Sequence, residues 1–204
     1  CMNRAGIAGA EYEMDDRMTA FTAERIRSLG MDGAKLMFRL DMGHFSRYSI
    51  QTIAYCAEAI KDCNTLGLPV FLEPLPVVRT SAGYQVTMEA DALIKTVGIG
   101  AGLGDSSTRL WLKIPYVPEY HRVARATTLP VLMLGGASKG NPIHMIQDFE
   151  RGMGEGHNVR GAMVGRNVLY PGKDDPAAVA AAVCYVIHGL ATCLEGVSVL
   201  RERR

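Results

Sequence analysis

The chain has 204 residues, of which 48% are hydrophobic and 21% are charged, so it can bury a core and is not disordered as a whole. Its formal net charge of +1 gives no electrostatic reason to expect nucleic acid or an anionic membrane surface as a partner. No apolar run approaches the length of a membrane span, and five cysteines without metal-ligand spacing favour reduced thiols over disulfides. We therefore expect one soluble, cytoplasmic domain over residues 1–204.

Short apolar segments alternate along the chain with longer helical patterns. The expected strands are nearly continuous apolar runs, as in parallel strands buried on both faces, and they span residues 34–40, 69–75, 110–116, 130–134 and 161–164. The expected helices lie between and after them, at residues 48–66, 89–102, 119–127, 142–152 and 176–194. This alternation predicts repeated βαβ units, and so an α/β protein.

Two α/β folds compete, a (β/α)8 TIM barrel and an open doubly wound sheet. The glycine cluster at residues 98–104 ends a helical pattern rather than opening a helix after a strand, so it indicates a loop more than a nucleotide site. Polar residues near the C-terminal ends of several strands favour the barrel, whose active sites form there. Only five strands are visible where a barrel has eight, so the open sheet remains an alternative.

Lys113 is the strongest candidate for a catalytic residue in the chain. It lies inside the apolar strand pattern LWLKIPY, where an ammonium without a partner is costly to bury. One interpretation is a lysine at a strand edge that extends to solvent. The other is a lysine in a pocket of low polarity, where burial favours the free amine that can attack a carbonyl.

Two other strands carry charged residues on apolar backgrounds. Lys35, Arg39 and Asp41 share one strand face at period two, and a second cation near Lys113 would favour its neutral amine. A salt-bridged group at a sheet edge, with Asp41 paired to either cation, is the alternative. Glu73 stands at the end of a buried strand, where it can move protons, pair with a cation on a neighbouring strand, or do both.

The last two expected strands each end in a glycine motif. Gly135 and Gly136 follow the first of them, and Gly165 and Arg166 follow the second. Glycine lets backbone N–H groups approach an anion, and arginine adds a bidentate donor. Because the loops after strands seven and eight commonly bind phosphate in barrels, these motifs together predict a phosphate site.

The sequence lacks the motifs of metal-dependent enzymes and of serine hydrolases. The five histidines form no i, i+4 metal pair and no HExxH motif, which argues against a zinc- or iron-dependent mechanism. No GxSxG sequence occurs, so a serine hydrolase is not expected.

Taken in order, the segments LWLKIPY, PVLMLGGAS and GAMVGRNVLYP resemble the class I (Schiff-base) aldolases of the archaeal-type fructose-bisphosphate, deoxyribose-phosphate and tagatose-bisphosphate aldolase superfamily. The segments DGAKLMFRLD and FLEP make a bacterial aldolase-like (β/α)8 subgroup the nearest match. The resemblance covers nearly the whole chain and identifies residues 1–4 with the end of strand three. It implies a TIM barrel truncated at its N-terminus, with strands one and two and most of strand three missing. We expect a longer natural polypeptide, and self-association of the 204 residues alone because strand edges are exposed.

The resemblance also implies roles for single residues. Lys113 matches the Schiff-base lysine of strand six. Lys35 and Glu73 match the substrate-contacting lysine and the catalytic glutamate of the tagatose-bisphosphate-type members, whereas the archaeal fructose-bisphosphate enzymes have tryptophan and tyrosine on strand five. The residues that hold substrate phosphate in the family are matched by Gly135, Gly136, Gly165 and Arg166.

The resulting expectation is a Schiff-base aldolase that makes or breaks a C–C bond in a phosphorylated sugar or keto acid and releases a triose phosphate. Lys113, Glu73 and Lys35 would be catalytic, and Arg39 and Asp41 would bind substrate. No metal or organic cofactor is expected, and the partners would be the sugar phosphate and further copies of the chain in a homo-oligomer. The alternatives are a phosphate-binding barrel isomerase or epimerase, and a barrel paralogue without catalysis.

Overall fold

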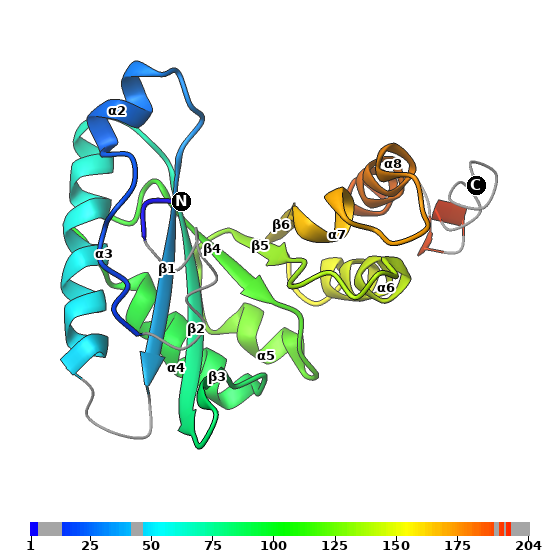
Figure 1. Cartoon of the computed structure of the whole chain (residues 1–204), viewed down its shortest axis with the longest axis horizontal. Coiled ribbons are helices and arrows are strands. Elements are labelled where there is room, and N and C mark those ends of the chain that lie inside the picture. The colour runs from blue at the N-terminus through cyan, green and yellow to red at the C-terminus, as the bar shows by residue number, and fades with distance from the viewer. Residues whose placement is uncertain (4–13, 42–46, 190–191, 194, 197–204) are drawn as a thin grey trace. The chain divides into compact units, whose positions relative to one another are not determined.

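Strands and helices alternate along most of the chain, and the five expected strands and five expected helices occur in the predicted order (Figure 1). The computed structural model describes residues 1–3, 14–41, 47–189, 192–193 and 195–196. Arg4, which the resemblance places at the end of a strand, and His44 lie outside them. The chain divides into two compact units, Cys1–Leu112 with Ala126–Pro130, and Lys113–Arg125 with Val131–Arg204.

The first unit contains a parallel set of strands. Strand β1 (Ala34–Asp41) pairs with β2 (Val70–Thr80), and β2 pairs with the first half of β4 (Leu110–Pro115). A short strand, β3 (Gly83–Val86), returns antiparallel along the end of β2. The three parallel strands confirm the sequence prediction. The extension of β2 to Thr80 and the hairpin with β3 were not expected, since this half-exposed segment has no continuous apolar run.

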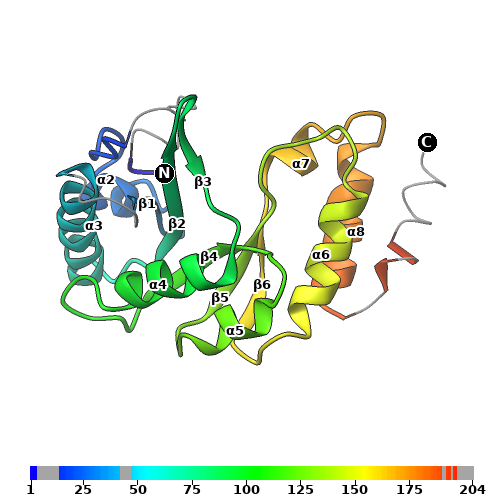
Figure 2. The same ribbon diagram turned by 90° about the horizontal axis from the view of Figure 1, so that it is seen from below.

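Helices cover one face of these strands. Helix α3 (Arg47–Thr65) packs against β1, and α4 (Ala90–Ala101) packs against β2 (Figure 2). A Cβ at Gly100 of α4 would lie 3.0 Å from Leu72 Cδ2, so the helix approaches the sheet closely there. A further short helix, α2 (Ala23–Ser28), contacts α3 and begins at Thr22, whose side chain accepts a hydrogen bond from the backbone N–H of Arg25.

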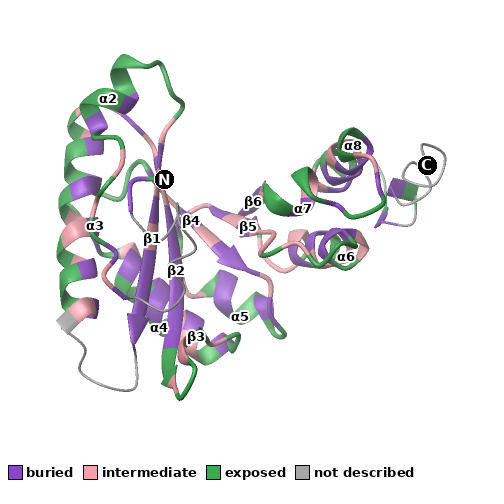
Figure 3. Ribbon diagram, in the orientation of Figure 1, coloured by how far each residue is buried: buried purple, intermediate pink, exposed green. Residues whose placement is uncertain are grey.

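Side-chain alternation along β1 separates an apolar face from a polar one. The apolar side chains are almost completely buried (Figure 3), and they are Ala34, Leu36, Phe38 and Leu40. The side chains of the intervening positions project to the opposite face of the strand, and they are Lys35, Met37, Arg39 and Asp41. The fold thus sets the charged residues of β1 on the face away from the helices that cover it.

The second unit is built on two parallel strands, β5 (Val131–Leu134) and β6 (Val159–Met163). Helix α6 (Ile143–Met153) packs against β6 and against α8 (Pro176–Ile187). The unit also holds α5 (Tyr120–Arg125) and a single helical turn, α7 (Arg166–Leu169), which is too short to produce a periodic pattern and was not expected.

Helix α8 begins where the sequence predicts and ends earlier than predicted. Asp175 accepts a hydrogen bond from the backbone N–H of Ala177, and Pro176 occupies the first turn, as is typical of helix starts. The helix ends at Ile187 rather than at residue 194, because Gly189 adopts a φ of 65°. Within the described residues, no helix combines the length and the apolar character that crossing a membrane requires.

Candidate active site

Two of the expected site residues form an ion pair on the polar face of the first unit. Lys35 Nζ lies 2.7 Å from Glu73 Oε2, although the strand register pairs Glu73 with Met37, so Lys35 reaches diagonally to the neighbouring strand. The two side chains are only 18% and 10% exposed. Lys35 Nζ also contacts Met37 Sδ. Glu73 is therefore a partner of a lysine on a neighbouring strand, one of the two roles that the sequence allowed.

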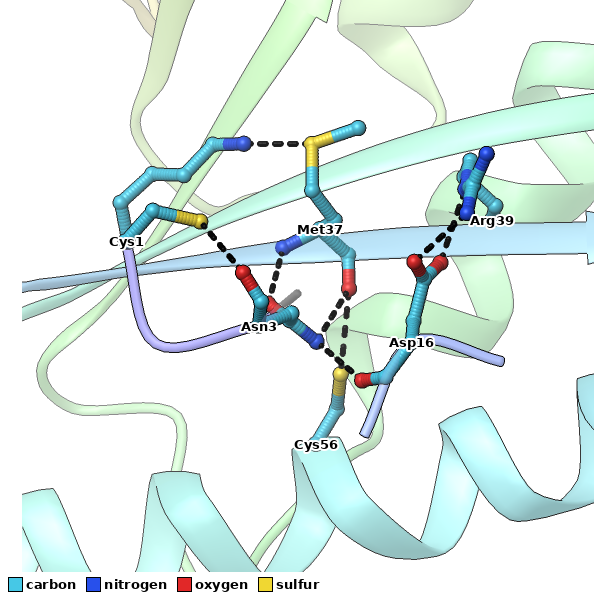
Figure 4. A network of polar contacts seen from close by, with 7 residues as sticks. Cys1, Asn3, Asp16, Met37, Arg39 and Cys56 are labelled. Carbon is cyan, nitrogen blue, oxygen red and sulfur yellow. Dashed lines mark hydrogen bonds and ion pairs between the residues drawn. The ribbon is translucent and has the colours of Figure 1, made fainter. Parts of the chain in front are cut away.

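Arg39 is held by a carboxylate from outside the strands. Its Nε donates to Asp16 Oδ2 at 2.9 Å and its Nη2 donates to Asp16 Oδ1 at 2.7 Å (Figure 4). Asp16 is fully buried and Arg39 is 5% exposed. Burial raises the pKa of the Asp16 carboxyl, and the hydrogen bonds from Arg39 act in the opposite direction. Sequence reasoning missed Asp16, because the segment around it has no periodic pattern and makes its partner only through tertiary contact.

A buried asparagine fixes the segment that carries Asp16. Asn3 Oδ1 accepts from the backbone N–H of Met37 at 2.6 Å, and Asn3 Nδ2 donates to Met37 O and to Asp16 O (Figure 4). Cys56 Sγ of α3 donates to the same Met37 carbonyl. Burial raises the pKa of the Cys56 thiol to about 12, so this cysteine stays protonated and structural. Asn3 thereby joins Asp16 to the middle of β1.

Asp41 lies at the end of its strand, whereas Lys113 lies inside its strand. Asp41 is buried at the end of β1, where its backbone N–H donates to Ser49 Oγ at 3.0 Å. Lys113 is the first residue of the second unit and is half-buried in β4, between the buried Leu112 and Ile114. The structure thus confirms that Lys113 lies in an apolar strand.

The expected phosphate residues lie in two loops of the second unit. Gly136 has a φ of 68°, a conformation that favours glycine. A Cβ at Gly135 would overlap Val164 and would come within 3.1 Å of Met145 Sδ, so no side chain fits there. Gly165 precedes α7, and Arg166 opens it with an exposed side chain.

Asn167 brings these two loops together, and sequence reasoning missed it. Its side chain is 4% exposed, and its Nδ2 donates to Gly135 O at 2.6 Å. The loops after β5 and β6 are thus in direct contact, as the phosphate prediction requires. The signal that could have found Asn167 is its residue type, since asparagine side chains commonly form hydrogen bonds with nearby backbone groups.

No metal centre emerges from the side chains that the structure describes. Among residues 1–3, 14–41, 47–189, 192–193 and 195–196, no three His, Cys, Asp or Glu side chains are grouped so that they could hold a metal ion.

A family model described as Cgl0159-like matches residues 1–184. The chain belongs to the Cgl0159-like family. The crystal structure of Cgl0159 from Corynebacterium glutamicum is 34% identical, with a TM-score of 0.84, over 93% of this chain and 63% of that one.

More distant relatives of this Cgl0159-like protein include named enzymes. It is 26% identical over 175 residues to 2-amino-3,7-dideoxy-D-threo-hept-6-ulosonate synthase 1 of Archaeoglobus fulgidus, covering 86% of this chain and 60% of the synthase. An archaeal fructose-1,6-bisphosphate aldolase, whose catalytic lysine is covalently bound to the carbinolamine intermediate of its substrate, matches with 20% identity and a TM-score of 0.67. That match covers 85% of this chain and 64% of the aldolase.

These comparisons confirm the predicted likeness to the archaeal fructose-1,6-bisphosphate aldolases at the level of the fold, and an α/β fold of TIM-barrel type rather than an open doubly wound sheet. The chain spans about six tenths of the length of each of these relatives.

Proposed function

We propose that this Cgl0159-like protein is a class I aldolase that forms a Schiff base through Lys113 and makes or breaks a C–C bond in a phosphorylated sugar or keto acid. The observation that carries the proposal is a half-buried lysine inside an apolar strand, in a chain whose first unit also holds the buried Lys35–Glu73 pair on β1 and β2.

The proposed reaction begins at the amine of Lys113. Its nitrogen attacks the substrate carbonyl carbon, and loss of water from the resulting carbinolamine gives an iminium. The iminium accepts the electron pair of the breaking C–C bond, while the proton of the substrate hydroxyl moves to Glu73, directly or through water. The enamine that remains takes up a proton at carbon, and hydrolysis of the new iminium frees Lys113 and the second product.

Glu73 has to be ionised to accept that proton. Its ion pair with Lys35 at 2.7 Å favours the carboxylate, because the lysine ammonium stabilises the negative charge in a site with little solvent. Arg39 and Asp41, on the same face of β1 as Lys35, would bind substrate oxygens.

The phosphate of the substrate would bind in the second unit. Because Gly135 and Gly136 have no side chains, the phosphate could come close to the backbone N–H groups of their loop. Gly165 belongs to the second loop, and the guanidinium of Arg166 would bind the phosphate oxygens. The name of one relative supports a phosphorylated substrate, since it is a fructose-1,6-bisphosphate aldolase. A triose phosphate would be one of the products.

The proposed setting is a homo-oligomer in the cytoplasm. All five cysteines are free, which suits a reducing compartment.

Borohydride reduction tests the proposal directly. The protein is incubated with triose and hexose phosphates in turn, reduced, digested and analysed by mass spectrometry. We expect a stable adduct on the peptide that contains Lys113, because borohydride reduces an iminium to a secondary amine. Turnover without any adduct would favour an isomerase or epimerase in which Lys113 and Glu73 only move protons, and neither turnover nor adduct would favour a paralogue without catalysis.

A further inference from the structure

Three consecutive backbone carbonyls of the loop after β5 converge on one side-chain amide. Asn167 Nδ2 lies 2.6 Å from Gly135 O, and 3.4 Å from both Gly136 O and Ala137 O. Asn167 itself is 4% exposed, so the amide that collects these carbonyls is shielded from water. A short, buried hydrogen bond of this kind holds a loop more firmly than one at the surface.

The orientation of these carbonyls fixes the direction of the N–H groups that follow them. The described chain contains no cis peptide bond, and in a trans peptide the N–H points away from the carbonyl. With their carbonyls toward Asn167, the three peptides direct the N–H groups of Gly136, Ala137 and Ser138 away from it. Within the described residues, none of these N–H groups donates to a protein acceptor.

Successive N–H groups that point to one side form a concave site for an anion. Such a run needs a residue in the left-handed region, and Gly136 provides it with a φ of 68°. The chemistry of the site is that of a tetrahedral oxyanion, since several N–H donors in a row can meet several terminal oxygens of one phosphate group.

The loop is held in this form by contacts besides that of Asn167. Ser138 Oγ donates to Tyr170 O, and its own lone pairs accept from the backbone N–H of Gly140. A Cβ at Gly172 would overlap the carbonyl of Gly140, so the two loops also touch directly. The loops after β5 and β6 are therefore joined at three places.

We propose that Asn167 is a positioning residue for substrate phosphate. It turns the N–H groups of Gly136, Ala137 and Ser138 toward the anion that Gly165 and Arg166 also bind. This inference rests on the phosphate site of the proposed function and adds to it the residue that holds the site in its binding form. Because contacts within the protein hold the two loops together, we expect the site to bind inorganic phosphate without the rest of the substrate.

The test compares two buried asparagines of the second unit. Asn158, which is 7% exposed, donates through Nδ2 to Ala124 O at 3.0 Å and directly precedes β6, whereas Asn167 follows that strand. Asn167→Leu and Asn158→Leu each replace an amide by an apolar group of similar size and delete an amide–carbonyl hydrogen bond. The dissociation constant for inorganic phosphate is measured by calorimetry on the full chain, after circular dichroism has shown that each variant is folded.

We expect Asn167→Leu to weaken phosphate binding at least about tenfold, which corresponds to the loss of one or two well-placed donors. Asn158→Leu should change the affinity by less than about twofold, because its hydrogen bond lies at the other end of β6. With a phosphorylated substrate, Asn167→Leu should raise KM far more than it lowers kcat. If Asn167→Leu does not fold, Asn167→Ala, which removes the same donor with less bulk, takes its place.

Equal effects of the two substitutions on phosphate affinity would overturn the inference, because Asn167 would then contribute only to packing. Arg166→Ala separates this failure from that of the proposed function. If Arg166→Ala loses phosphate and Asn167→Leu keeps it, the phosphate site stands and the role of Asn167 is wrong. If the unaltered protein does not bind phosphate, the proposed phosphate site is wrong, and the role of Asn167 with it.

Discussion

The guanidinium of Arg39 and the carboxylate of Asp16 form a bidentate pair, with hydrogen bonds of 2.9 and 2.7 Å, in a part of the first unit that water hardly reaches. The pair lies on the same face of β1 as Lys35, which is itself paired with Glu73. Each cation on this face therefore has its own carboxylate. This balance allows four charged side chains to stay in a largely buried place, since an unpaired charge there is strongly unfavourable.

The first prediction concerns the stability of this pair. Asp16→Leu should lower the free energy of unfolding by about 3–5 kcal/mol, because it leaves the Arg39 guanidinium buried without its bidentate partner. The double variant Asp16→Leu/Arg39→Met should lose much less than the sum of the single changes, since no unpaired charge remains. Urea unfolding of the three variants measures the difference. Additive losses would show that the two side chains do not depend on each other.

The parallel strands could be predicted because each contains a short, nearly continuous apolar run next to a helical pattern, whereas β3 has no such run and was missed. The partners of the charged residues could not be predicted in the same way. Asp16 and Asn3 come from segments with no periodicity, and they reach β1 only because the chain folds back onto it. The sequence pattern shows which charged residues of an apolar strand need a partner of opposite charge. Which residue provides that charge depends on tertiary contacts that the pattern does not contain.

The second prediction concerns Lys113. Lys113→Met, which keeps the length and the apolar stem of the side chain, should leave folding unchanged and abolish the borohydride-trapped adduct. Lys95→Met, in an exposed position of α4, is the matched control and should keep the adduct. Peptide mapping by mass spectrometry checks both. An adduct found on Lys35 or Lys95 would show that Lys113 is not the nucleophile.

The third prediction separates the two chemical steps. Glu73→Gln should still allow Lys113 to form the trapped adduct, because carbonyl attack does not require the carboxylate. Turnover should fall by about a hundredfold or more, the usual contribution of a general base. Glu58→Gln, at an exposed position of α3, serves as the control. If adduct formation and turnover fall together, Glu73 acts before C–C cleavage instead.

The two loops that follow β5 and β6 show a similar limit of prediction. Glycine after a strand was a sufficient signal for Gly135, Gly136 and Gly165, because the residue type itself implies close backbone approach. Asn167 has only its residue type as a signal, because the carbonyls to which it donates belong to a loop about 30 residues earlier in the chain.

The fourth prediction concerns the two glycines after β5, which are required for different reasons. Gly135→Ala should destabilise the second unit, because its Cβ would overlap Val164. Gly136→Ala meets no atom within 4 Å, and its cost should be about 1–2 kcal/mol from the left-handed backbone alone. Thermal unfolding measures both. A larger loss for Gly136→Ala than for Gly135→Ala would contradict the packing around this loop.

The last prediction concerns Arg166, whose exposed guanidinium follows the glycine that ends the β6 loop. Arg166→Ala should weaken phosphorylated ligands by about 1.5–3 kcal/mol, the range for hydrogen bonds to charged groups, and should leave unphosphorylated ones nearly unaffected. Arg160→Ala is the matched control, because Arg160 is equally exposed but stands near the start of β6 instead of after its end. It changes the net charge by the same amount, so any general electrostatic attraction for anions is equal in the two variants. Titration with a sugar phosphate and with the corresponding free sugar gives the four affinities needed. Equal losses for both ligands, or for both variants, would argue against a specific phosphate contact by Arg166.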